Sequence, residues 1–250
     1  MRKDFVSLTK LICPVIGAFL LPIGTDMNTS KRRERTRALI MLSLFTAIAF
    51  LSIYIVNFKV AFLTFDIKNV FITIAAMIYG PISGIIVSFA AALVEFIFHN
   101  TTGFYGFVMN FVSSASFAFL GAFFYRRYKT LAGSYLALGL ATLGSTAFMM
   151  LTNLFITPFY MGVSMGEVAK MIPTLLFPFN LIKCLVNAAV VLILYKPISL
   201  ALARAGVLKK EGNATYFNKK TLLTLVIALV LIAASLFVFF AVLGGKISFH

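Results

Sequence analysis

Two ionisable residues, Glu95 and Lys183, lie inside long apolar stretches of the sequence. A charged side chain at membrane depth is costly, so it indicates a functional site by default. Lys183 shares one helical face with Asn180, three residues before it, and with Asn187, four residues after it. Because lipid cannot satisfy such a polar stripe, the stripe must face protein or a cavity. This polar stripe predicts a ligand pocket. The alternative interpretation is that Lys183 only forms a structural ion pair with Glu95.

Two further amides and one loop are placed where they could complete this pocket. Asn153 precedes the Thr157-Pro158 break near the outer end of its predicted helix, and Asn110 lies in the helix before it. Asn110 could equally form a hydrogen bond that only joins helices. The loop 60–66 alternates apolar and polar side chains and contains two aromatic residues, so it could fold over a planar ligand. The alternative is an ordinary loop among the lipid headgroups.

The composition places these residues in a membrane protein. Of the 250 residues, 61% are hydrophobic and 12% are charged, whereas soluble domains have about 45–50% and about 25%. The charges are too few for a water-soluble surface, and the apolar residues are too many for a disordered chain. The two cysteines, Cys13 and Cys184, lie in apolar runs, which excludes a disulfide-stapled secreted scaffold. We therefore expect an all-α polytopic protein of the cell membrane, with spans of about 20 residues each.

Apolar stretches separated by turn signals predict the helices. Gly80-Pro81 separates two of them, and Thr157-Pro158 ends another. The outer loops expected between helices include 57–69 and 159–173. The predicted helices cover residues 37–56, 70–79, 82–98, 104–125, 135–156 and 176–203, with an additional C-terminal transmembrane helix at 222–243.

These elements predict a simple domain organisation. A six-helix substrate-binding membrane domain covers 31–204, and a polar cytoplasmic linker covers 205–221. The additional helix at 222–243 and a short tail at 244–250 follow. Residues 1–30 form an N-terminal segment that could be signal-like, an extra helix or a result of the chosen start site, since Met27 would begin a basic N-terminus.

Lysine and arginine are concentrated in three blocks, at 31–37, 126–129 and 196–220, which hold 14 of the 22 basic residues. Alternation of the helices puts all three blocks on one side, and cytoplasmic loops of membrane proteins collect basic residues. The basic loops are therefore expected in the cytoplasm, and the loops with Lys59, Lys68 and Lys170 are expected outside. The same distribution explains the net charge of +15 without any binding of nucleic acid.

The sequence offers little that could support catalysis. It has no G-x-x-x-x-G-K-[ST] phosphate loop and no H-E-x-x-H motif, so it cannot hydrolyse ATP by itself. His99 and His250 are too few and too scattered for a metal site. We expect a protein that is not an enzyme and that needs no metal or cofactor. Transport driven by an ion gradient is less expected, because such carriers tend to have paired halves with broken helices.

Four short motifs carry a resemblance to a known family. They are FLTFD at 62–66, YGPISG at 79–84, NLFITP at 153–158 and PFNLIK at 178–183, and they follow a basic N-terminus and a first helix rich in small residues. Over roughly residues 31–204 the chain resembles the substrate-binding S components of energy-coupling factor (ECF) vitamin transporters. The last two motifs resemble those of the riboflavin-specific branch.

The resemblance implies a six-helix fold that binds the vitamin near the outer face, under the first loop. It also implies three partners, a transmembrane coupling subunit and two ATPase subunits. The family's small-xxx-small docking motif on the first helix, normally Ala-xxx-Ala, here reads Ser43-Leu-Phe-Thr-Ala47. The N-terminal segment and the seventh helix depart from the six-helix pattern. The implied riboflavin contacts are Asn153, Asn180, Lys183, Leu63, Thr64, Phe65 and Asp66, to which Glu95 and Asn110 are added for their depth.

The pocket residues also fit riboflavin on chemical grounds. The edge of the isoalloxazine ring is an imide, with one N–H between two carbonyls, and an Asn amide and a Lys ammonium offer matching groups. Folate or biotin would call for an arginine fork against carboxylates, and no arginine lies at membrane depth. We therefore expect the substrate-binding subunit of an ATP-driven importer. The alternative is a self-contained secondary transporter for a flavin or another planar vitamin.

Overall fold

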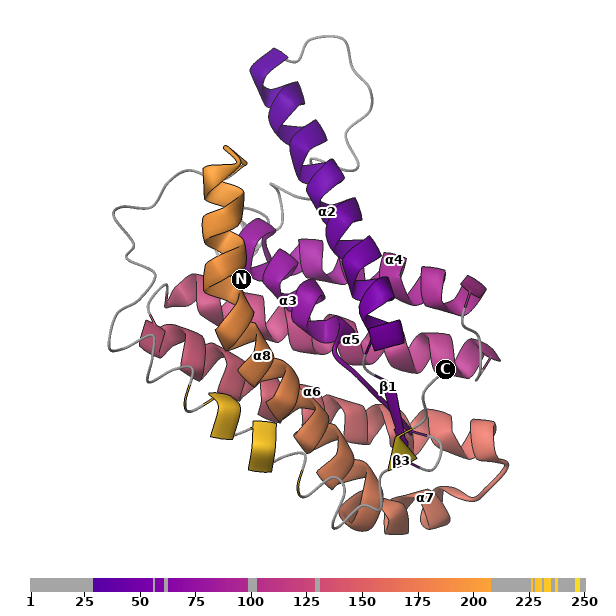
Figure 1. The fold of residues 1–250 in the computed structure, drawn as a ribbon. Coiled ribbons are helices and arrows are strands. Elements are labelled where there is room, and N and C mark those ends of the chain that lie inside the picture. Colours follow the sequence, from indigo (N-terminus) through magenta and orange to yellow (C-terminus); the bar gives the residue numbers. More distant parts are fainter. Residues whose placement is uncertain are drawn as a thin grey trace, which may run out of the picture.

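The computed structural model describes residues 29–55, 57–60, 63–98, 103–128 and 131–207, and the shorter pieces 226, 228–230, 232–234, 237 and 246–247. Most of the expected N-terminal segment and of the expected linker therefore lies outside the described residues. The described part of the predicted seventh helix is helical. The main helices are α2 (Thr29–Ile55), α3 (Lys68–Tyr79), α4 (Pro81–Phe98), α5 (Gly103–Arg127), α6 (Leu131–Met161), α7 (Met165–Met171) and α8 (Phe177–Arg204) (Figure 1).

Five helical segments of the described chain are apolar and long enough to cross a membrane, and α3 is a shorter apolar helix. These helices confirm the prediction of an all-helical polytopic membrane protein for this part of the chain. The only departure among the described residues is one small β-sheet. The predicted helix boundaries agree with the structure to within a few residues except at three places: α2 begins at Thr29 instead of residue 37, and α6 and α7 differ from the prediction.

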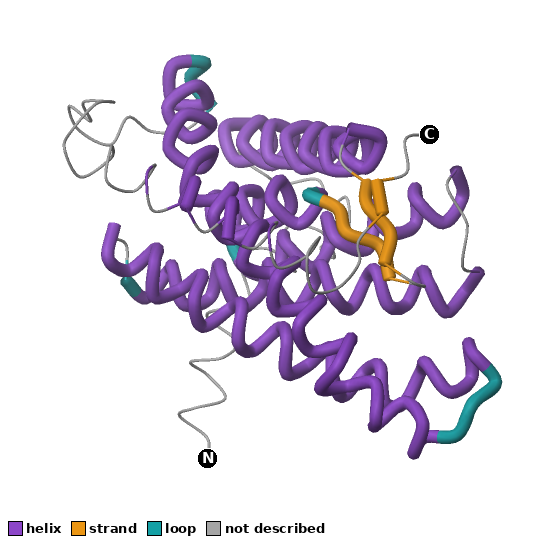
Figure 2. The backbone as a smooth tube through the Cα atoms, turned by 60° about the horizontal axis from the view of Figure 1, so that its bottom comes forward, coloured by secondary structure: helices purple, strands orange, loops and turns teal. Residues whose placement is uncertain are grey.

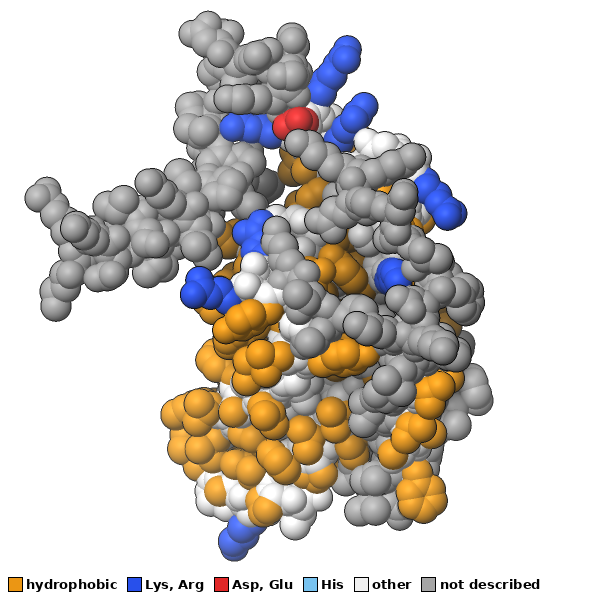
Figure 3. Space-filling view, turned by 90° about the vertical axis from the view of Figure 1, so that its left-hand side faces the viewer, with side chains coloured by type: hydrophobic (Ala, Val, Ile, Leu, Met, Phe, Trp, Pro, Cys, Tyr) orange, Lys and Arg blue, Asp and Glu red, His pale blue; other side chains and the backbone are white. Residues whose placement is uncertain are grey.

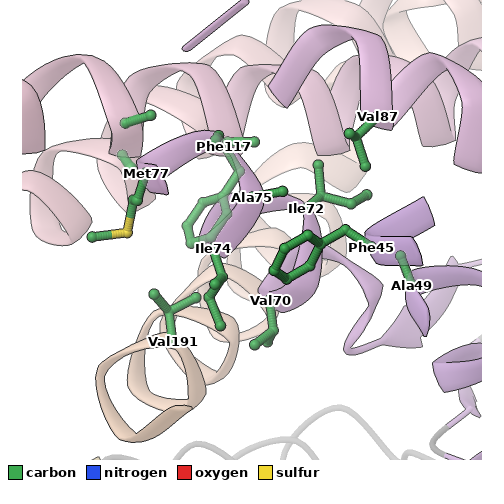
Figure 4. Close-up of a cluster of buried hydrophobic side chains, with 14 of the residues drawn as sticks. Phe45, Ala49, Val70, Ile72, Ile74, Ala75, Met77, Val87, Phe117 and Val191 are labelled. Atoms are coloured by element: carbon green, nitrogen blue, oxygen red, sulfur yellow. The ribbon is translucent and has the colours of Figure 1, made fainter. Parts of the chain in front are cut away.

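The short helix α3 lies at the centre of the bundle. Nine of its twelve residues are buried, and it packs against α2, α4, α5 and α8. A helix that is apolar on every side has to be buried, and here four longer helices cover it. Figure 4 shows Val70, Ile72, Ile74, Ala75 and Met77 of α3 among Phe45 and Ala49 of α2, Val87 of α4, Phe117 of α5 and Val191 of α8.

The turn between α3 and α4 is formed by Gly80-Pro81, as predicted. Gly80 has φ of 120°, a value that favours glycine, and Pro81 occupies the first position of α4, where its missing N–H is not needed. A Cβ at Gly80 would lie 3.0 Å from the guanidinium carbon of Arg126, which covers the turn. A Cβ at Gly84 would lie 2.7 Å from the Cβ of Ala76, so this glycine permits the close approach of α3 and α4.

The prediction that a helix ends at Thr157-Pro158 is wrong. Helix α6 continues through Pro158 to Met161. Proline removes only one backbone donor, and membrane helices tolerate it because neighbouring groups compensate. The helix ends instead at Gly162, which has φ of 67° and donates its N–H to the carbonyl of Pro158 over 2.9 Å. A glycine just past the last turn is a common end signal of helices.

The loop expected at 159–173 contains a helix, so this part of the prediction is also wrong. Ser164 caps α7, because its hydroxyl accepts the N–H of Glu167 and the Glu167 carboxylate accepts the N–H of Ser164, both over 3.3 Å. This S-x-x-E capping box is readable in a sequence. A π-helical turn, Ile172–Leu176, then leads directly into α8.

The loop expected at 57–69 is largely a β-hairpin, made of β1 (Asn57–Val60) and β2 (Leu63–Asp66). The alternation of apolar and polar residues that we interpreted as a folded-over loop is the pattern of a strand. A third strand, β3 (Lys246–Ile247), pairs with the other side of β1, which gives the strand order β2-β1-β3. Figure 2 shows this small sheet beside the helices.

Exposed basic side chains gather at one end of the molecule. Figure 3 shows most of the lysine and arginine side chains in its upper part, an apolar band beneath them and a further basic side chain at the bottom. Arg126 and Arg127 end α5 and are exposed, whereas the exposed Lys170 belongs to α7 at the hairpin end of the bundle (Figure 1). An apolar band between two polar ends is the surface expected of a protein that spans a bilayer.

Single cysteines test the orientation that this charge distribution favours. In a background with Cys13→Ser and Cys184→Ala, the variants Arg127→Cys and Lys170→Cys each place one thiol at one end of the bundle. We expect a membrane-impermeant maleimide to label Lys170→Cys in intact cells and Arg127→Cys only after permeabilisation, because basic loops stay in the cytoplasm. The cysteine-free background serves as the control. Labelling of Arg127→Cys in intact cells would contradict the orientation.

Candidate functional site

Four charged side chains, three of them buried and the fourth slightly exposed, form one cluster where β2 meets α3, α4 and α8. Nζ of Lys183 lies 2.9 Å from Oδ2 of Asp66. Nζ of Lys68 lies 2.6 Å from Oε2 of Glu95 and 3.6 Å from Oδ2 of Asp66. The most exposed of these side chains, that of Glu95, is 12% exposed. Two ammonium groups thus balance two carboxylates, and such pairing is what makes buried charges tolerable.

Neutral groups complete the hydrogen bonds of this ion cluster, by which we mean Asp66, Lys68, Glu95 and Lys183. Lys183 donates a second hydrogen bond to the backbone carbonyl of Thr64 over 2.9 Å. The amide of Asn110 on α5 donates to Oε1 of Glu95 over 2.9 Å. The ion cluster and its partners therefore join the hairpin to α3, α4, α5 and α8.

Asp66 is ionised in this setting. Burial by itself would raise the pKa of its carboxyl group, but the ammonium groups of Lys183 and Lys68 and their hydrogen bonds outweigh burial. The pKa of Asp66 therefore lies below its ordinary value of 3.8. An ionised Asp66 at neutral pH is what allows one carboxylate to hold two lysines.

The ion pair between Lys183 and Glu95, which was the alternative to a ligand pocket, is not formed, because each of the two residues has another partner. Glu95 binds Lys68, and Lys183 binds Asp66. We predicted Lys68 as a charge of the outer loop, yet it is 1% exposed and bridges both carboxylates. The sequence held one signal for this arrangement. Glu95 lies without a counter-charge in an apolar helix, and two opposite charges, at 66 and 68, lie just before the helix predicted at 70–79. Hydropathy alone does not say that loop charges fold inward.

The apolar part of the hairpin packs on α8. Phe65 is 2% exposed and forms a cluster with Phe179, Ile182 and Val186, against which Leu63 also packs. The hairpin thus presents apolar side chains to one part of α8 and a charge to another. We call this set, Phe65, Phe179, Ile182 and Val186 with Leu63, the lid contact.

Asn153 and Asn180 lie on α6 and α8, which pack against each other. Both are buried, and each donates to a backbone carbonyl one turn back, Asn153 to Met149 and Asn180 to Leu176, both over 2.8 Å. Of the predicted site residues, the structure therefore brings Thr64, Asp66 and Lys183 into direct contact. It links Glu95 and Asn110 to them through Lys68. Asn153 and Asn180 instead form hydrogen bonds within their own helices.

Several of these groups keep hydrogen-bonding capacity that a ligand could use. An ammonium has three donors, and Lys183 uses two of them, on Thr64 and Asp66. Asn187 donates to the carbonyls of Asp66 and Lys183, but its buried Oδ1 has no hydrogen-bond partner among the described residues. Leaving such an atom unsatisfied costs about 1–3 kcal/mol. The site offers donors and acceptors for binding.

The pattern G-x-S-x-G occurs at 162–166 but is not a catalytic nucleophile elbow. That motif requires a strand before the serine and a helix after it, with a histidine partner. Here α6 precedes the segment, and the exposed Ser164 uses its hydroxyl to cap α7. Its role is structural.

The two small residues predicted for docking, Ser43 and Ala47, are exposed on α2. Phe45 and Ala49 of the same helix are buried in the core. Small exposed side chains four residues apart allow another helix to approach closely in a membrane.

Known proteins share this architecture. Residues 37–195 match the family described as ECF transporter, substrate-specific component. The chain belongs to this family. The riboflavin transporter RibU of Staphylococcus aureus (strain TCH60) is 28% identical over 180 residues, which cover 68% of this chain and 95% of the relative. A solved structure of the S component of a bacterial ECF transporter has a TM-score of 0.58 and 28% identity, over 67% of this chain and 98% of that chain.

Membership decides the class of the protein. It is the substrate-specific S component of an ECF transporter, a multi-pass membrane protein and a transport subunit rather than an enzyme. S components work with an energising module. The ion cluster, Asn153 and Asn180 all lie within the matched residues.

A double-mutant cycle tests whether charge balance stabilises the S component. We expect Glu95→Gln to lower the free energy of unfolding in detergent by about 3–5 kcal/mol, because it leaves Lys68 buried without its closest counter-charge. The double variant Lys68→Met with Glu95→Gln should recover most of this loss, since Asp66 and Lys183 then balance each other. Denaturant titration measures both, and the single variant Lys68→Met completes the cycle.

Glu167→Gln is the matched control for that cycle. Glu167 is exposed, and glutamine also serves in a capping box, so its unfolding free energy should stay close to that of the parent. A double variant that is less stable than Glu95→Gln alone would contradict the role of charge balance.

Proposed function

We propose that this S component binds riboflavin beneath the β1–β2 hairpin and delivers it inward with a transmembrane coupling subunit and two ATPase subunits. The observation that carries the proposal is the likeness to the riboflavin transporter RibU over almost the whole of that relative. The buried Asn153, Asn180 and Lys183 on two adjacent helices support it.

The charge balance of the site favours an uncharged ligand. Asp66, Lys68, Glu95 and Lys183 sum to zero, so a carboxylate ligand would add a buried charge without a counter-charge, at a cost of several kcal/mol. Riboflavin is neutral, and its imide edge presents one N–H between two carbonyls. The third donor of Lys183 and the second amide donor of Asn180 could bind such carbonyls.

The apolar side chains near the polar ones favour a flat ligand. Phe65 of the hairpin and Phe179 of α8 belong to the lid contact. Phe65 directly precedes Asp66, and Phe179 lies one helical turn before Lys183. Ligand sites commonly combine an apolar wall with a few polar groups that fix orientation. A flat aromatic ring system with one polar edge matches that combination.

Two substitutions test the pocket. Asn180→Ala and Lys183→Met should each weaken riboflavin binding by about 5–150-fold, which corresponds to the ~1–3 kcal/mol lost when a buried partner stays unsatisfied. Quenching of flavin fluorescence on binding to the purified protein measures the affinity. Lys170→Met, an exposed lysine of α7, is the matched control and should bind as the parent does. Well-folded Asn180→Ala and Lys183→Met proteins with parental affinity would overturn the pocket, and sustained uptake by the chain alone in vesicles would favour a secondary transporter.

A second pair of variants separates binding from transport. Ser43→Trp combined with Ala47→Trp should abolish riboflavin uptake in cells that supply the coupling subunit and ATPases, because bulky residues keep a partner helix at a distance. Riboflavin binding by the purified variant should stay near the parental value, since both residues are exposed. Leu143→Trp with Ala147→Trp, four apart on the exposed face of α6, is the control and should transport normally. Parental uptake by the α2 variant would refute the docking surface.

A further inference from the structure

Glu95 is connected to the rest of the ion cluster through one lysine. Its Oε2 pairs with Nζ of Lys68 over 2.6 Å, and its Oε1 accepts a hydrogen bond from the side-chain amide of Asn110 over 2.9 Å. Among the described residues, Lys68 is its one ion-pair partner. Both carboxylate oxygens are therefore fixed, one by a charge and the other by a neutral donor.

Lys68 links the charge of Glu95 to the residues at the hairpin. Its Nζ lies 3.6 Å from Oδ2 of Asp66, and the same oxygen lies 2.9 Å from Nζ of Lys183. Without the charge of Glu95, the one carboxylate of Asp66 would face two ammonium groups, and the ion cluster would carry one excess positive charge. Solvent ions screen buried charges much less than exposed ones, so this excess would be felt throughout the site.

A ligand that binds Lys183 lies within the field of all four charges. Lys183 is the member of the ion cluster to which the proposed function assigns a ligand contact, and it shares the carboxylate of Asp66 with Lys68. A neutral ion cluster gives a buried anion no counter-charge for the water that the anion loses, whereas an excess positive charge supplies one. The charge at position 95 therefore bears on the ligand charge that the site can hold.

We propose that Glu95 is a specificity-determining residue that excludes anionic flavins. It acts through Lys68 and Asp66, because its charge keeps the site neutral without any contact between Glu95 and the ligand. The excluded class includes flavin mononucleotide, the phosphate ester of riboflavin, since a phosphate monoester adds about 1.5–2 negative charges at pH 7. This assignment rests on the proposed function, because it concerns the selectivity of the same site.

Four proteins that differ in charge test this assignment. Glu95→Gln leaves one excess positive charge and Lys68→Met one excess negative charge, whereas the parent and the double variant are neutral. The preference for riboflavin over flavin mononucleotide should narrow by about tenfold in Glu95→Gln, widen in Lys68→Met and stay parental in the double variant, because unlike charges attract and like charges repel. Quenching of flavin fluorescence gives both dissociation constants for each purified protein. A loss of stability alone would not shift this preference in opposite directions.

Glutamine suits this test because it changes the charge and little else. Its oxygen can face Lys68 while its NH₂ group meets the oxygen of a rotated Asn110 amide. Both single variants are purified with riboflavin, because a ligand that binds the folded state offsets a loss of stability. Asn110→Lys gives the same excess positive charge with the whole ion cluster in place, so it should also narrow the preference. Glu167→Gln removes an exposed carboxylate of α7 and is the matched control, which should keep the parental preference.

The possible outcomes distinguish this assignment from the proposed function. Riboflavin binding with the same preference in Glu95→Gln, Lys68→Met and Asn110→Lys would refute the role of Glu95 and leave the proposed function intact. A narrowed preference that persists in the neutral double variant would contradict it as well. A parent protein that binds neither flavin would overturn the proposed function and this assignment together.

Discussion

The neutral ion cluster of Asp66, Lys68, Glu95 and Lys183 is the constraint on which the site depends. Each of these charges would cost several kcal/mol if it were buried alone, so the segments that carry them must meet at one place. The carboxylate of Asp66 is the centre of this arrangement, because both lysines contact it. It holds the hairpin against α8 through Lys183. A displacement of the hairpin would separate these charges in an apolar setting.

The position of α3 follows from the same constraint. Its first residue, Lys68, belongs to the ion cluster, and the next, Asn69, accepts a hydrogen bond from the hydroxyl of Ser114 on α5 over 2.7 Å. Its other end is fixed by Gly80, over which Arg126 lies. A helix pinned at both ends and covered by four longer helices is rigid, and it gives the ion cluster a fixed base.

The sequence was sufficient for those features that hydropathy and charge counts can report. The membrane helices, the Gly80-Pro81 turn and the involvement of Lys183 in a buried polar site could all be predicted, because each depends on residues close together in the chain. The partner of Lys183 could not, because Asp66 lies 117 residues away in a segment that looks like an exposed loop. Lys68 was missed for the same reason, and α6 was cut short because Pro158 is a weaker stop in lipid than in water. Only Gly162 marked the true end.

The hairpin follows directly on α2, the helix that carries the proposed docking residues. Helix α2 ends at Ile55 and β1 begins at Asn57, so one residue separates them. Ala47 lies eight residues before Ile55, about 12 Å along a helix that rises 1.5 Å per residue. A partner helix that packs on the exposed Ser43 and Ala47, as we propose, would therefore act on the helix that leads into the hairpin. Under the docking that we propose, a tilt of α2 would pull on β1 and work against the ion cluster that holds β2. Energy supplied by a partner docked on Ser43 and Ala47 would then be spent on the bonds of Asp66.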